Sequence, residues 1–227
     1  MTIQERLDFI HRTSWMKSRP GLERITELMH LLGDPQKNLR FIHVAGTNGK
    51  GSTTAMLSSV LRKAGYRTGM YTSPHLWRVH ERFCINGEDI SDEELCAVAE
   101  EVRPCADQME DQPTEFEIIT AIAFKYFKDK GCDLVVLEVG LGGRFDATNV
   151  IEQPLLSIIT GISLDHVAIL GDTIEKIAYE KAGIIKTGCP ILFGGGHSHA
   201  ARGVIEQESR HREAPYYEVD QIGRAHV

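Results

Sequence analysis

Apolar residues along this chain fall into short continuous runs separated by longer stretches with helical spacing. The continuous runs lie at residues 41–45, 134–138 and 155–160, and they are typical of strands covered on both faces. Shorter runs at residues 67–72 and 190–193 predict two more strands. Strands that alternate with helices favour an α/β domain of three layers, with a mostly parallel central sheet and helices on both faces.

The helical spacing predicts amphipathic helices whose apolar stripes face the sheet. The stretches concerned are residues 3–11, 22–32, 51–64, 91–102, 114–130 and 174–181. Capping boxes open two of them: Ser91 with Glu94, and Thr114 with Glu117. In the helix at residues 51–64 the expected inward stripe is Leu57, Val60, Leu61 and Ala64.

Turn signals separate these elements. Asn86-Gly87 predicts a hairpin within residues 79–90. Residues 104–113 are polar and carry a proline at each end, which predicts an irregular segment. Three glycines followed by His197 and His199 predict a mobile loop at residues 194–199, and the spacing of the two histidines is a weak metal signal.

A glycine-rich loop follows the first predicted strand and precedes a predicted helix. Its glycines allow a tight turn with inward N–H groups, and the helix directs the positive end of its dipole at a bound anion, so the loop is predicted to bind nucleotide phosphates. Lys50 adds positive charge for the β- and γ-phosphates, and Ser52 or Thr53 offers a hydroxyl near the metal. Gly51 stands where a P-loop usually has Ser or Thr, so a plain glycine-rich turn is the alternative. The predicted nucleotide-binding residues are Gly46, Thr47, Asn48, Gly49, Lys50, Gly51, Ser52 and Thr53.

Glu138 ends the buried strand at residues 134–138 and is a candidate metal ligand. In open α/β sheets ligands bind outside the carboxyl ends of the strands, so Glu138 and the glycine turn at residues 140–143 should face the phosphate loop. The alternative is a carboxylate that merely ends a strand. A dense polar cluster follows the turn and indicates a site: Arg144, Asp146, Thr148 and Asn149.

The same edge of the sheet should carry Ser73 and His166, each of which follows a predicted strand. That position favours a role for His166 in holding a metal or ordering water, over an ordinary surface histidine. Lys181 lies on the inward stripe of its helix. Either its stem passes the core and its amine reaches solvent, or its amine serves the site.

Composition narrows the class of protein. The 227 residues carry a formal net charge of −7, which disfavours a nucleic-acid binder and favours small-molecule partners. Five cysteines without a C-x-x-C pair predict free thiols in a reducing compartment, so we expect a cytoplasmic protein. No apolar run approaches membrane-spanning length, and we expect no membrane association.

The motifs together resemble the amino-terminal ATPase domain of the folylpolyglutamate synthase and dihydrofolate synthase family, a branch of the Mur ligase superfamily. The resemblance covers roughly residues 17–192 and rests on motifs in a consistent order: IHVAGTNGKGS, TSPHL, NGEDIS, VLEVGLGGRFDATN, SLDH and AYEKAGIIK.

The resemblance implies an ATP-dependent ligase that adds L-glutamate to dihydropteroate, to folate polyglutamate tails or to both, through an acyl phosphate. It implies that residues 49–52 hold ATP, that Ser73, Glu138 and His166 bind Mg²⁺, and that Lys181 is carbamylated. The catalytic residues implied are Lys50, Lys181 and His166. The segments matching the pterin side of the family are Arg19, Pro20, Gly21, Leu22, Thr114, Glu115, Phe116, Glu117, Phe145, Asp146 and Ala147. Another amino acid ligase of the Mur type and a nucleotide-binding module without ligase chemistry are the alternatives.

Family members continue beyond the length of this chain. We therefore expect residues 1–220 to be a central ATP-binding domain incomplete at its C-terminal side, and the smaller glutamate-ligase domain to be absent. Residues 221–227 read like a translated sequencing adapter. On this interpretation the fragment alone is inactive, and the complete enzyme is a monomer.

Overall fold

The computed structural model describes Phe9, residues 20–195 and residues 198–219. Several sequence-based predictions lie outside these residues. They are Arg19, His197, the adapter-like residues 221–227 and, apart from Phe9, the helix at residues 3–11.

The described strands form one eight-stranded sheet in the order β4-β3-β2-β5-β1-β6-β7-β8. The strands are β1 (Phe41–Ala45), β2 (Thr68–Tyr71), β3 (Phe83–Ile85), β4 (Glu88–Asp89), β5 (Leu134–Glu138), β6 (Leu156–Ile159), β7 (Ile191–Phe193) and β8 (Tyr216–Glu218). All neighbours from β2 to β8 pair in parallel, whereas β2–β3 and β3–β4 are antiparallel. The predicted mostly parallel sheet is confirmed.

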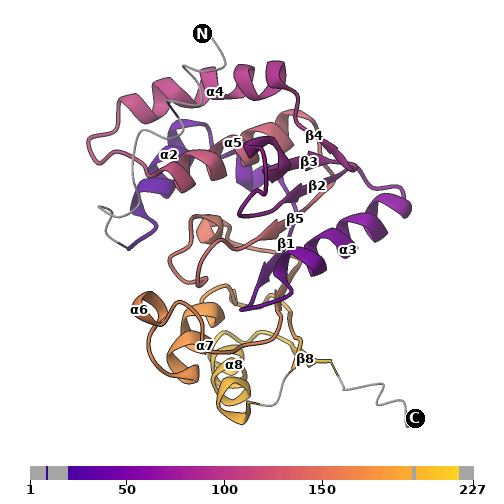
Figure 1. Ribbon diagram of the computed structural model, residues 1–227, viewed down its shortest axis with the longest axis vertical. Helices are drawn as coiled ribbons and strands as arrows, with labels where there is room; N and C mark the ends of the chain where they lie inside the picture. Colours follow the sequence, from indigo (N-terminus) through magenta and orange to yellow (C-terminus); the bar gives the residue numbers. More distant parts are fainter. Residues whose placement is uncertain (1–8, 10–19, 196–197, 220–227) are drawn as a thin grey trace.

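Helices cover both faces of the sheet, which confirms the three-layer architecture (Figure 1). The helices are α2 (Glu23–Leu31), α3 (Lys50–Lys63), α4 (Asp92–Asp107), α5 (Glu115–Asp129), α6 (Val167–Leu170), α7 (Ile174–Ala182) and α8 (His199–His211). Short 3-10 helices are η2 (Pro35–Asn38), η3 (Val79–Arg82) and η4 (Ala147–Val150). One core joins α2, α4 and α5 to β1, β2, β3 and β5, and a second joins α7 and α8 to β6 and β7. On the opposite face, α3 packs through Leu57 and Leu61.

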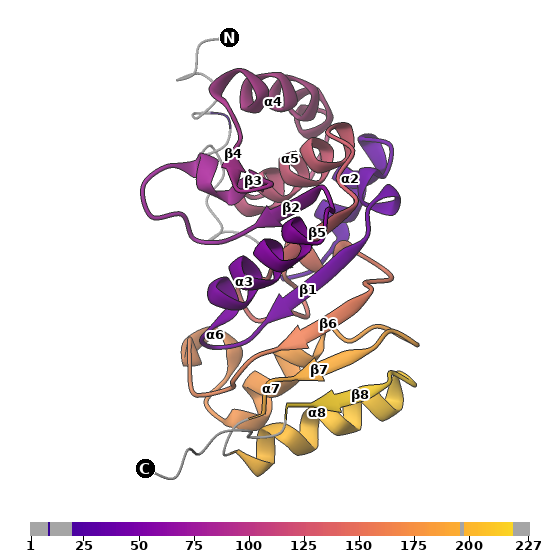
Figure 2. The same cartoon turned by 90° about the vertical axis from the view of Figure 1, so that its right-hand side faces the viewer.

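The register of the central strands determines where the loops meet. Val44 of β1 lies opposite Glu138 of β5 on one side and opposite Ile158 of β6 on the other. The loops that leave β1, β5 and β6 therefore begin at the same edge of the sheet. Figure 2 shows α6 at this end of the sheet, next to the tip of β1, with α3 crossing in front of the strands.

Local capping signals are confirmed. The side chain of Ser91 accepts from the N–H of Glu94, and that of Thr114 accepts from the N–H of Glu117, with both glutamates bonding back to the cap backbone. The hairpin at Asn86-Gly87 is also present between β3 and β4. Both residues have positive φ, 53° and 88°, as this tight turn requires.

Other expectations were wrong in detail. Residues 79–82 form η3 rather than a strand, and α4 continues through Pro104 to Asp107. Proline removes one hydrogen bond from a helix, but here the following turn is held by Ala106, which is fully buried. The loop expected at residues 194–199 ends at Ser198, because this residue caps α8 and His199 begins the helix. Neither α8 nor β8 was predicted.

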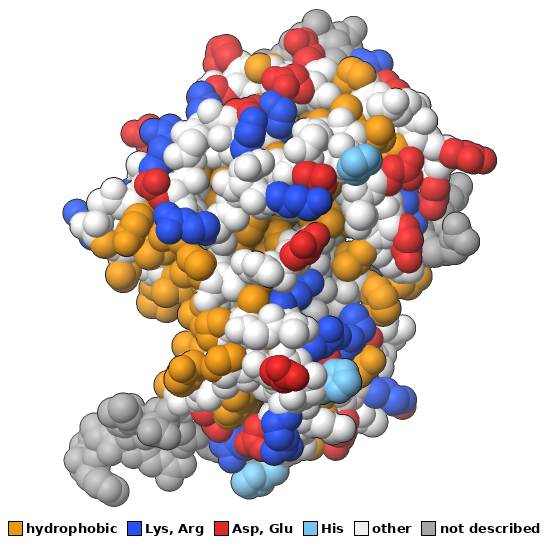
Figure 3. Space-filling model, turned by 180° about the vertical axis from the view of Figure 1, so that it is seen from behind, with side chains coloured by type: hydrophobic (Ala, Val, Ile, Leu, Met, Phe, Trp, Pro, Cys, Tyr) orange, Lys and Arg blue, Asp and Glu red, His pale blue; other side chains and the backbone are white. Residues whose placement is uncertain are grey.

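The expected inward stripe of α3 is only partly buried. Leu57 and Leu61 contact the core, but Val60 is 64% exposed and Ala64 is exposed as well. Figure 3 shows apolar side chains along the margin of the molecule on the side of α3. Thr54 and Ser58 take the buried positions instead, so the helix faces the sheet with a small polar flank. None of the helices in the described part of the chain is long and apolar enough to cross a membrane.

Close packing between α7 and the loop after β5 gives a test of the fold. A Cβ on Gly183 would lie 2.3 Å from the Cα of Arg144, whereas a Cβ on Gly203 in α8 meets nothing within 4 Å. We predict that Gly183→Ala lowers the free energy of unfolding by about 1–3 kcal/mol, because the backbone at Arg144 must move away from the end of α7. Gly203→Ala should raise it by up to about 1 kcal/mol, because alanine favours the helix. Urea unfolding followed by circular dichroism measures both, and equal stabilities would contradict the packing described.

Candidate functional site

The phosphate loop connects β1 to α3 and is fixed by contacts with the segment after β6. Gly46 has φ of 150°, and a Cβ there would lie 1.7 Å from Oγ1 of Thr160, so this position requires glycine. The N–H of Thr47 donates to the carbonyl of Gly161 at 2.9 Å. Gly49, with φ of 81°, is the N-cap of α3. The first N–H groups of this long helix therefore open at the loop, as an anion site requires.

Two lysine ammonium groups converge on the carbonyl oxygen of Gly46. Nζ of Lys50 donates to it at 3.0 Å and to the carbonyl of Thr47 at 3.2 Å. Nζ of Lys181 donates to the same Gly46 oxygen at 2.9 Å. The structure thus joins two residues that are 131 positions apart in the sequence (181 minus 50) at one backbone atom.

Lys181 points inward, as the stripe on α7 predicted. It is only 2% exposed, so its amine reaches the phosphate loop and not solvent. Burial, and after it the positive charge of Lys50, lowers the pKa of Lys181 to about 8, while Asp165 opposes the shift. A much larger fraction of this amine is neutral at physiological pH than for an ordinary lysine.

Glu138 and Ser73 lie together beside the loop. The backbone N–H of Ser73 donates to Oε2 of Glu138 at 3.2 Å. Glu138 is 4% exposed, and burial raises its pKa, while the Ser73 N–H and the charges of Lys50 and Arg82 oppose that change. The hydroxyl of Ser73 is buried and has no hydrogen-bond partner in the described part of the chain. A carboxylate and an unpaired hydroxyl side by side are oxygen donors of the kind that Mg²⁺ prefers.

His166, the third predicted metal ligand, is exposed at the start of α6. Its backbone is left-handed, with φ of 46°, and Nε2 lies 3.5 Å from Oδ1 of Asp165. The structure therefore places His166 on the loop after β6, at the predicted edge, but pairs it with its neighbour and not with Glu138 or Ser73.

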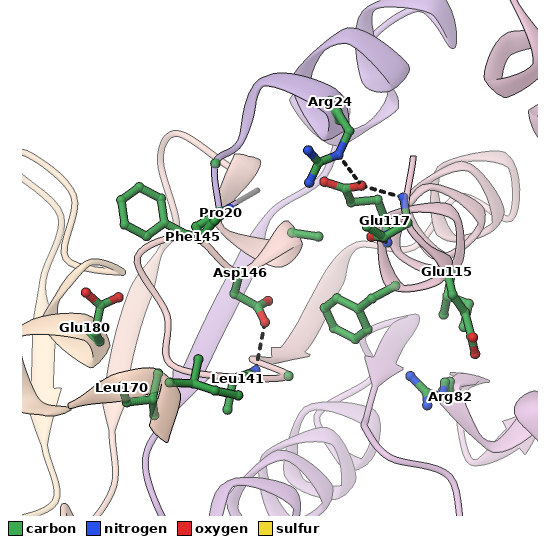
Figure 4. Close-up of a pocket in the computed structure, with 17 residues that line it drawn as sticks. Pro20, Arg24, Arg82, Glu115, Glu117, Leu141, Phe145, Asp146, Leu170 and Glu180 are labelled. Atoms are coloured by element: carbon green, nitrogen blue, oxygen red, sulfur yellow. Dashed lines mark hydrogen bonds and ion pairs between the residues drawn. The ribbon is translucent and has the colours of Figure 1, made fainter. Parts of the chain in front are cut away.

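A cavity of about 660 Å³ opens on the same edge, between the α2–α5 half and the α7 half of the molecule. Figure 4 shows side chains from both halves around it. All three predicted substrate segments contribute to its lining: Pro20, Gly21, Thr114, Glu115, Phe116, Glu117, Phe145, Asp146 and Ala147. Leu22 does not line the cavity but packs against the neighbouring core.

Asp146 is a buried carboxylate that lines this cavity. Its Oδ2 accepts from the N–H of Leu141 at 2.9 Å, and its Oδ1 accepts from the N–H of Thr148 at 3.0 Å (Figure 4 shows the first of these). Burial raises the pKa of Asp146, and these hydrogen bonds oppose the rise. Asn149 donates to the carbonyls of Arg144 and Gly183, so it ties this loop to the end of α7. Of the predicted polar cluster, Asp146 thus lines the cavity, whereas Asn149 holds the loop in place.

Sequence reasoning missed the two arginines of the cavity. Arg24 forms a buried ion pair with Glu117 at 3.0 Å (Figure 4). Arg82 is 9% exposed, and its Nε donates to Nδ1 of His75 at 2.9 Å. Arg82 lies within the predicted hairpin at residues 79–90 and Arg24 within the predicted helix at residues 22–32, so neither position carried a local signal of a site. The other lining residues that were not predicted as substrate contacts are Ile119, Gly140, Leu141, Ile169, Leu170 and Glu180.

Glu138 lies beside the phosphate loop and near the cavity. A Cβ on Gly51 of the loop would lie 3.6 Å from Oε2 of Glu138, and the carboxylate interacts electrostatically with Arg82 and Asp146, which line the cavity. A ligand in the cavity whose negative end points to Glu138 would therefore lie near the phosphate site. Such an arrangement suits transfer of a phosphoryl group to a bound acid.

Comparison with protein families gives one matching model, that of the Mur ligase middle domain, over residues 44–190. Among curated proteins, the dihydrofolate synthase/folylpolyglutamate synthase of Bacillus subtilis is 48% identical over 218 residues, which are 94% of this chain and 50% of the relative. The chain thus spans about half the length of this relative.

Solved structures give the same relationship. A complex of folylpolyglutamate synthase with AMPPCP and folate superimposes with a TM-score of 0.92 at 39% identity, covering 97% of this chain and 55% of that one. FolC of Escherichia coli in complex with DHPP and ADP gives a TM-score of 0.88 at 33% identity, covering 96% of this chain and 51% of that one.

The buried amine of Lys181 gives a prediction about stability and pH. A lysine whose pKa falls on folding loses a proton that the unfolded chain keeps, so stability rises as pH increases from about 8 toward 10.5. Lys181→Met should therefore raise the free energy of unfolding at pH 7 by roughly 1–3 kcal/mol, because it removes a buried charge.

The advantage of Lys181→Met should shrink as pH rises through 8–10.5, because over this range the lysine is neutral in the folded protein while the unfolded chain keeps its proton. Lys186, whose pKa burial also lowers to about 8, is present in both proteins and cancels in the comparison. Urea unfolding at pH 7 and pH 10 tests this, and a difference that does not depend on pH would contradict it.

Proposed function

Because the chain belongs to the Mur ligase family through its middle domain, we propose that it forms the ATP-binding half of an enzyme that adds L-glutamate to dihydropteroate, to folate or to both. The single observation that carries the proposal is the position of Glu138, which lies beside the phosphate loop and near a cavity of about 660 Å³. The relatives support this reading, since they are dihydrofolate and folylpolyglutamate synthases.

ATP is the proposed nucleotide. The loop from Gly46 to Gly49 and the N-terminus of α3 would receive its phosphates. Lys50 would exchange its two carbonyl partners for phosphate oxygens, which are stronger acceptors because they are charged. Structures of folylpolyglutamate synthase in complex with AMPPCP support a nucleotide of this class.

The cavity is the proposed site for the pterin-bearing acid. Phe116 and Phe145 provide aromatic surface for a flat ring, and Asp146 provides an acceptor for ring N–H donors. Of the two arginines that line the cavity, Arg82 is the one that interacts electrostatically with Glu138, so it would orient the carboxylate of the substrate toward the phosphate loop. Folate and DHPP complexes of related enzymes support an acid of this class.

The reaction then proceeds in two steps. A carboxylate oxygen of the bound acid attacks the γ-phosphorus of ATP, the bond to the bridging oxygen breaks, and ADP leaves. The amine of glutamate next attacks the acyl phosphate, an amide forms, inorganic phosphate leaves, and the amine loses a proton. Lys50 and Arg82 hold the two reacting anions in place, and positioning with charge neutralisation is what phosphoryl transfer requires.

Mg²⁺ is the proposed metal, and the residues present fit it. The buried hydroxyl of Ser73 has no hydrogen-bond partner among residues 20–195 and 198–219, and the N–H of the same residue donates to Glu138, so both side chains would hold the ion. His166 is the third proposed ligand. The metal, when bound, supplies positive charge for the phosphate oxygens.

Carbamylation of Lys181 is proposed because the low pKa of this lysine leaves part of its amine neutral. A neutral amine can add to the carbon of CO₂ and release a proton, which leaves a carbamate anion. With a pKa of about 8, roughly a tenth of the amine is neutral at pH 7. The product would bring negative charge to a position beside Gly46, where two cations now meet.

The glutamate site is proposed to lie in the part of the protein beyond this chain. Residues 1–220 would then be a central domain, and the remaining half of the relatives' length would supply a smaller ligase domain. The adapter-like reading of residues 221–227 stays a prediction, which sequencing of the source locus past Asp220 tests.

Lys50 gives the first test of the proposed function. We predict that Lys50→Ala in an intact enzyme carrying this chain reduces ADP formation at least about a hundredfold, because it removes a charge that is stabilising only when phosphate is present. Lys63→Ala is the matched control, since Lys63 ends the same helix and is exposed. Coupled assay of ADP release measures both, and normal turnover of Lys50→Ala would refute the loop assignment.

Lys181 gives the second test. Lys181→Ala should lose activity because the carbamate can no longer form, and short-chain carboxylic acids should restore part of it by placing an anion in the space vacated. The assay compares turnover with and without added acid, and uses Lys50→Ala as a variant that acid should not rescue. Full activity of Lys181→Ala without added acid would remove the proposed carbamate.

A further inference from the structure

His43 lies in the middle of the central strand β1, away from the residues used above. It is fully buried, and its Nε2 lies 2.9 Å from Oγ1 of Thr148. Thr148, also fully buried, places the same Oγ1 2.5 Å from Oδ1 of Asp146. A buried chain of hydrogen bonds therefore runs from the centre of the sheet to the carboxylate of the cavity.

We propose that His43 is a positioning residue: by donating its Nε2 proton to Thr148, it directs the Thr148 hydroxyl proton to Asp146 and keeps Asp146 an ionised acceptor. This inference deepens the proposed function and rests on it for the identity of the ligand.

The hydroxyl of Thr148 makes two contacts with a single proton. A threonine hydroxyl has one proton, so Thr148 can donate to Asp146 or to His43, but not to both. If it donates to Asp146, Nε2 of His43 must carry the proton that fills the other contact. If it donates to His43, Asp146 must be protonated to fill the short contact, and the proton of the imidazole moves to Nδ1.

The surroundings of His43 decide between these two arrangements. Nδ1 is buried without a hydrogen-bond partner among the described residues. A proton on Nδ1 would be a buried donor left unpaired, which costs about 1–3 kcal/mol. Burial also lowers the pKa of His43 to about 3, so the ring is neutral and carries only one proton. The favoured tautomer is the one with the proton on Nε2.

The consequence for a ligand concerns Asp146. Leu141 and Thr148 already donate backbone N–H groups to its two oxygens, and the hydroxyl of Thr148 adds a third donor. An ionised carboxylate so held can still accept from N–H donors on a ring in the cavity, whereas a protonated one would offer a competing donor. His43 therefore favours ligands that present N–H groups at this end, as a 2-amino-4-oxopterin does.

Other titratable groups act on the two ends of the chain of hydrogen bonds and remain in every variant below. Tyr71 and Glu138 interact electrostatically with Asp146, and Lys186 acts on His43. Facing the cavity from other elements are Arg24, Arg82, Glu115, Glu117 and Glu180.

Binding of pteroate to the intact enzyme, titrated from pH 5.5 to pH 8.5, tests the inference. His43→Met removes the donor, and His43→Gln keeps an N–H in nearly the same place. We expect His43→Met to bind pteroate about tenfold more weakly than the native protein at pH 6 and nearly equally at pH 8.5, because Asp146 takes up a proton more readily. His43→Gln should follow the native pH profile.

Thr148 provides the second pair of variants. Thr148→Val should reproduce the pH shift of His43→Met, and Thr148→Ser should not. The double variant His43→Met/Thr148→Val should bind no more weakly than Thr148→Val alone, because His43 acts through Thr148. Additive losses, or equal profiles for His43→Met and His43→Gln, would overturn the inference and leave the proposed function intact.

A measurement on the unsubstituted protein does not depend on whether the variants fold. In ¹⁵N-histidine spectra, His43 should carry its proton on Nε2 across pH 6–8, and a proton on Nδ1 would overturn the inference. Failure of the unsubstituted protein to bind pteroate would instead overturn the proposed substrate, and the inference with it.

Discussion

The carbonyl oxygen of Gly46 accepts hydrogen bonds from Lys50 and from Lys181, and the arrangement of the site depends on this shared contact. Two positive charges at one neutral oxygen repel each other, and one of them is almost completely removed from water. The backbone of Gly46 packs so closely against Thr160 that no side chain fits between them. This packing fixes the loop and the position of the Gly46 carbonyl, so the two lysines meet there despite their repulsion. An anion brought to the loop converts the repulsion into attraction. The apo site is thus less stable electrostatically than the site with phosphate or another anion bound.

The parallel sheet brings the remaining groups to the same place. Because Val44 of β1 lies opposite Glu138 of β5, the carboxylate begins where the phosphate loop begins. The chain after Glu138 then turns through glycines that approach α7 closely, since a Cβ on Gly143 would lie 2.9 Å from the carbonyl of Glu180. This contact holds the loop that carries Asp146 against the helix that carries Lys181. A displacement of either element would therefore change the cavity and the phosphate site together.

Much of this fold could be predicted from the sequence because its signals are local. Buried strands, capping boxes and the glycine loop each lie within a few residues, and the inward stripe of α7 placed Lys181 correctly. The stripe on α3 failed at Val60, because periodicity does not say how far a sheet extends beneath a helix. Arg24 was missed because its role depends on Glu117, which is 93 residues away. Contacts of this kind exist only once the elements have packed.

Burial acts on four ionisable groups of the site in the same direction, since it favours the neutral form of each: His43, Lys181, Glu138 and Asp146. The two carboxylates differ in the number of hydrogen-bond donors around them. Asp146 has donors on both oxygens, from two backbone N–H groups and a hydroxyl, so its charge is satisfied by the protein. Within the described residues, Glu138 receives one backbone N–H from Ser73. Its remaining lone pairs face Lys50 and Arg82 only at longer range. Asp146 is therefore suited to accept weak donors from a neutral ring, whereas Glu138 is the carboxylate at which an added cation gains most. The sheet buries both carboxylates, but Asp146 is suited to recognise the ring of a ligand and Glu138 to bind a cation.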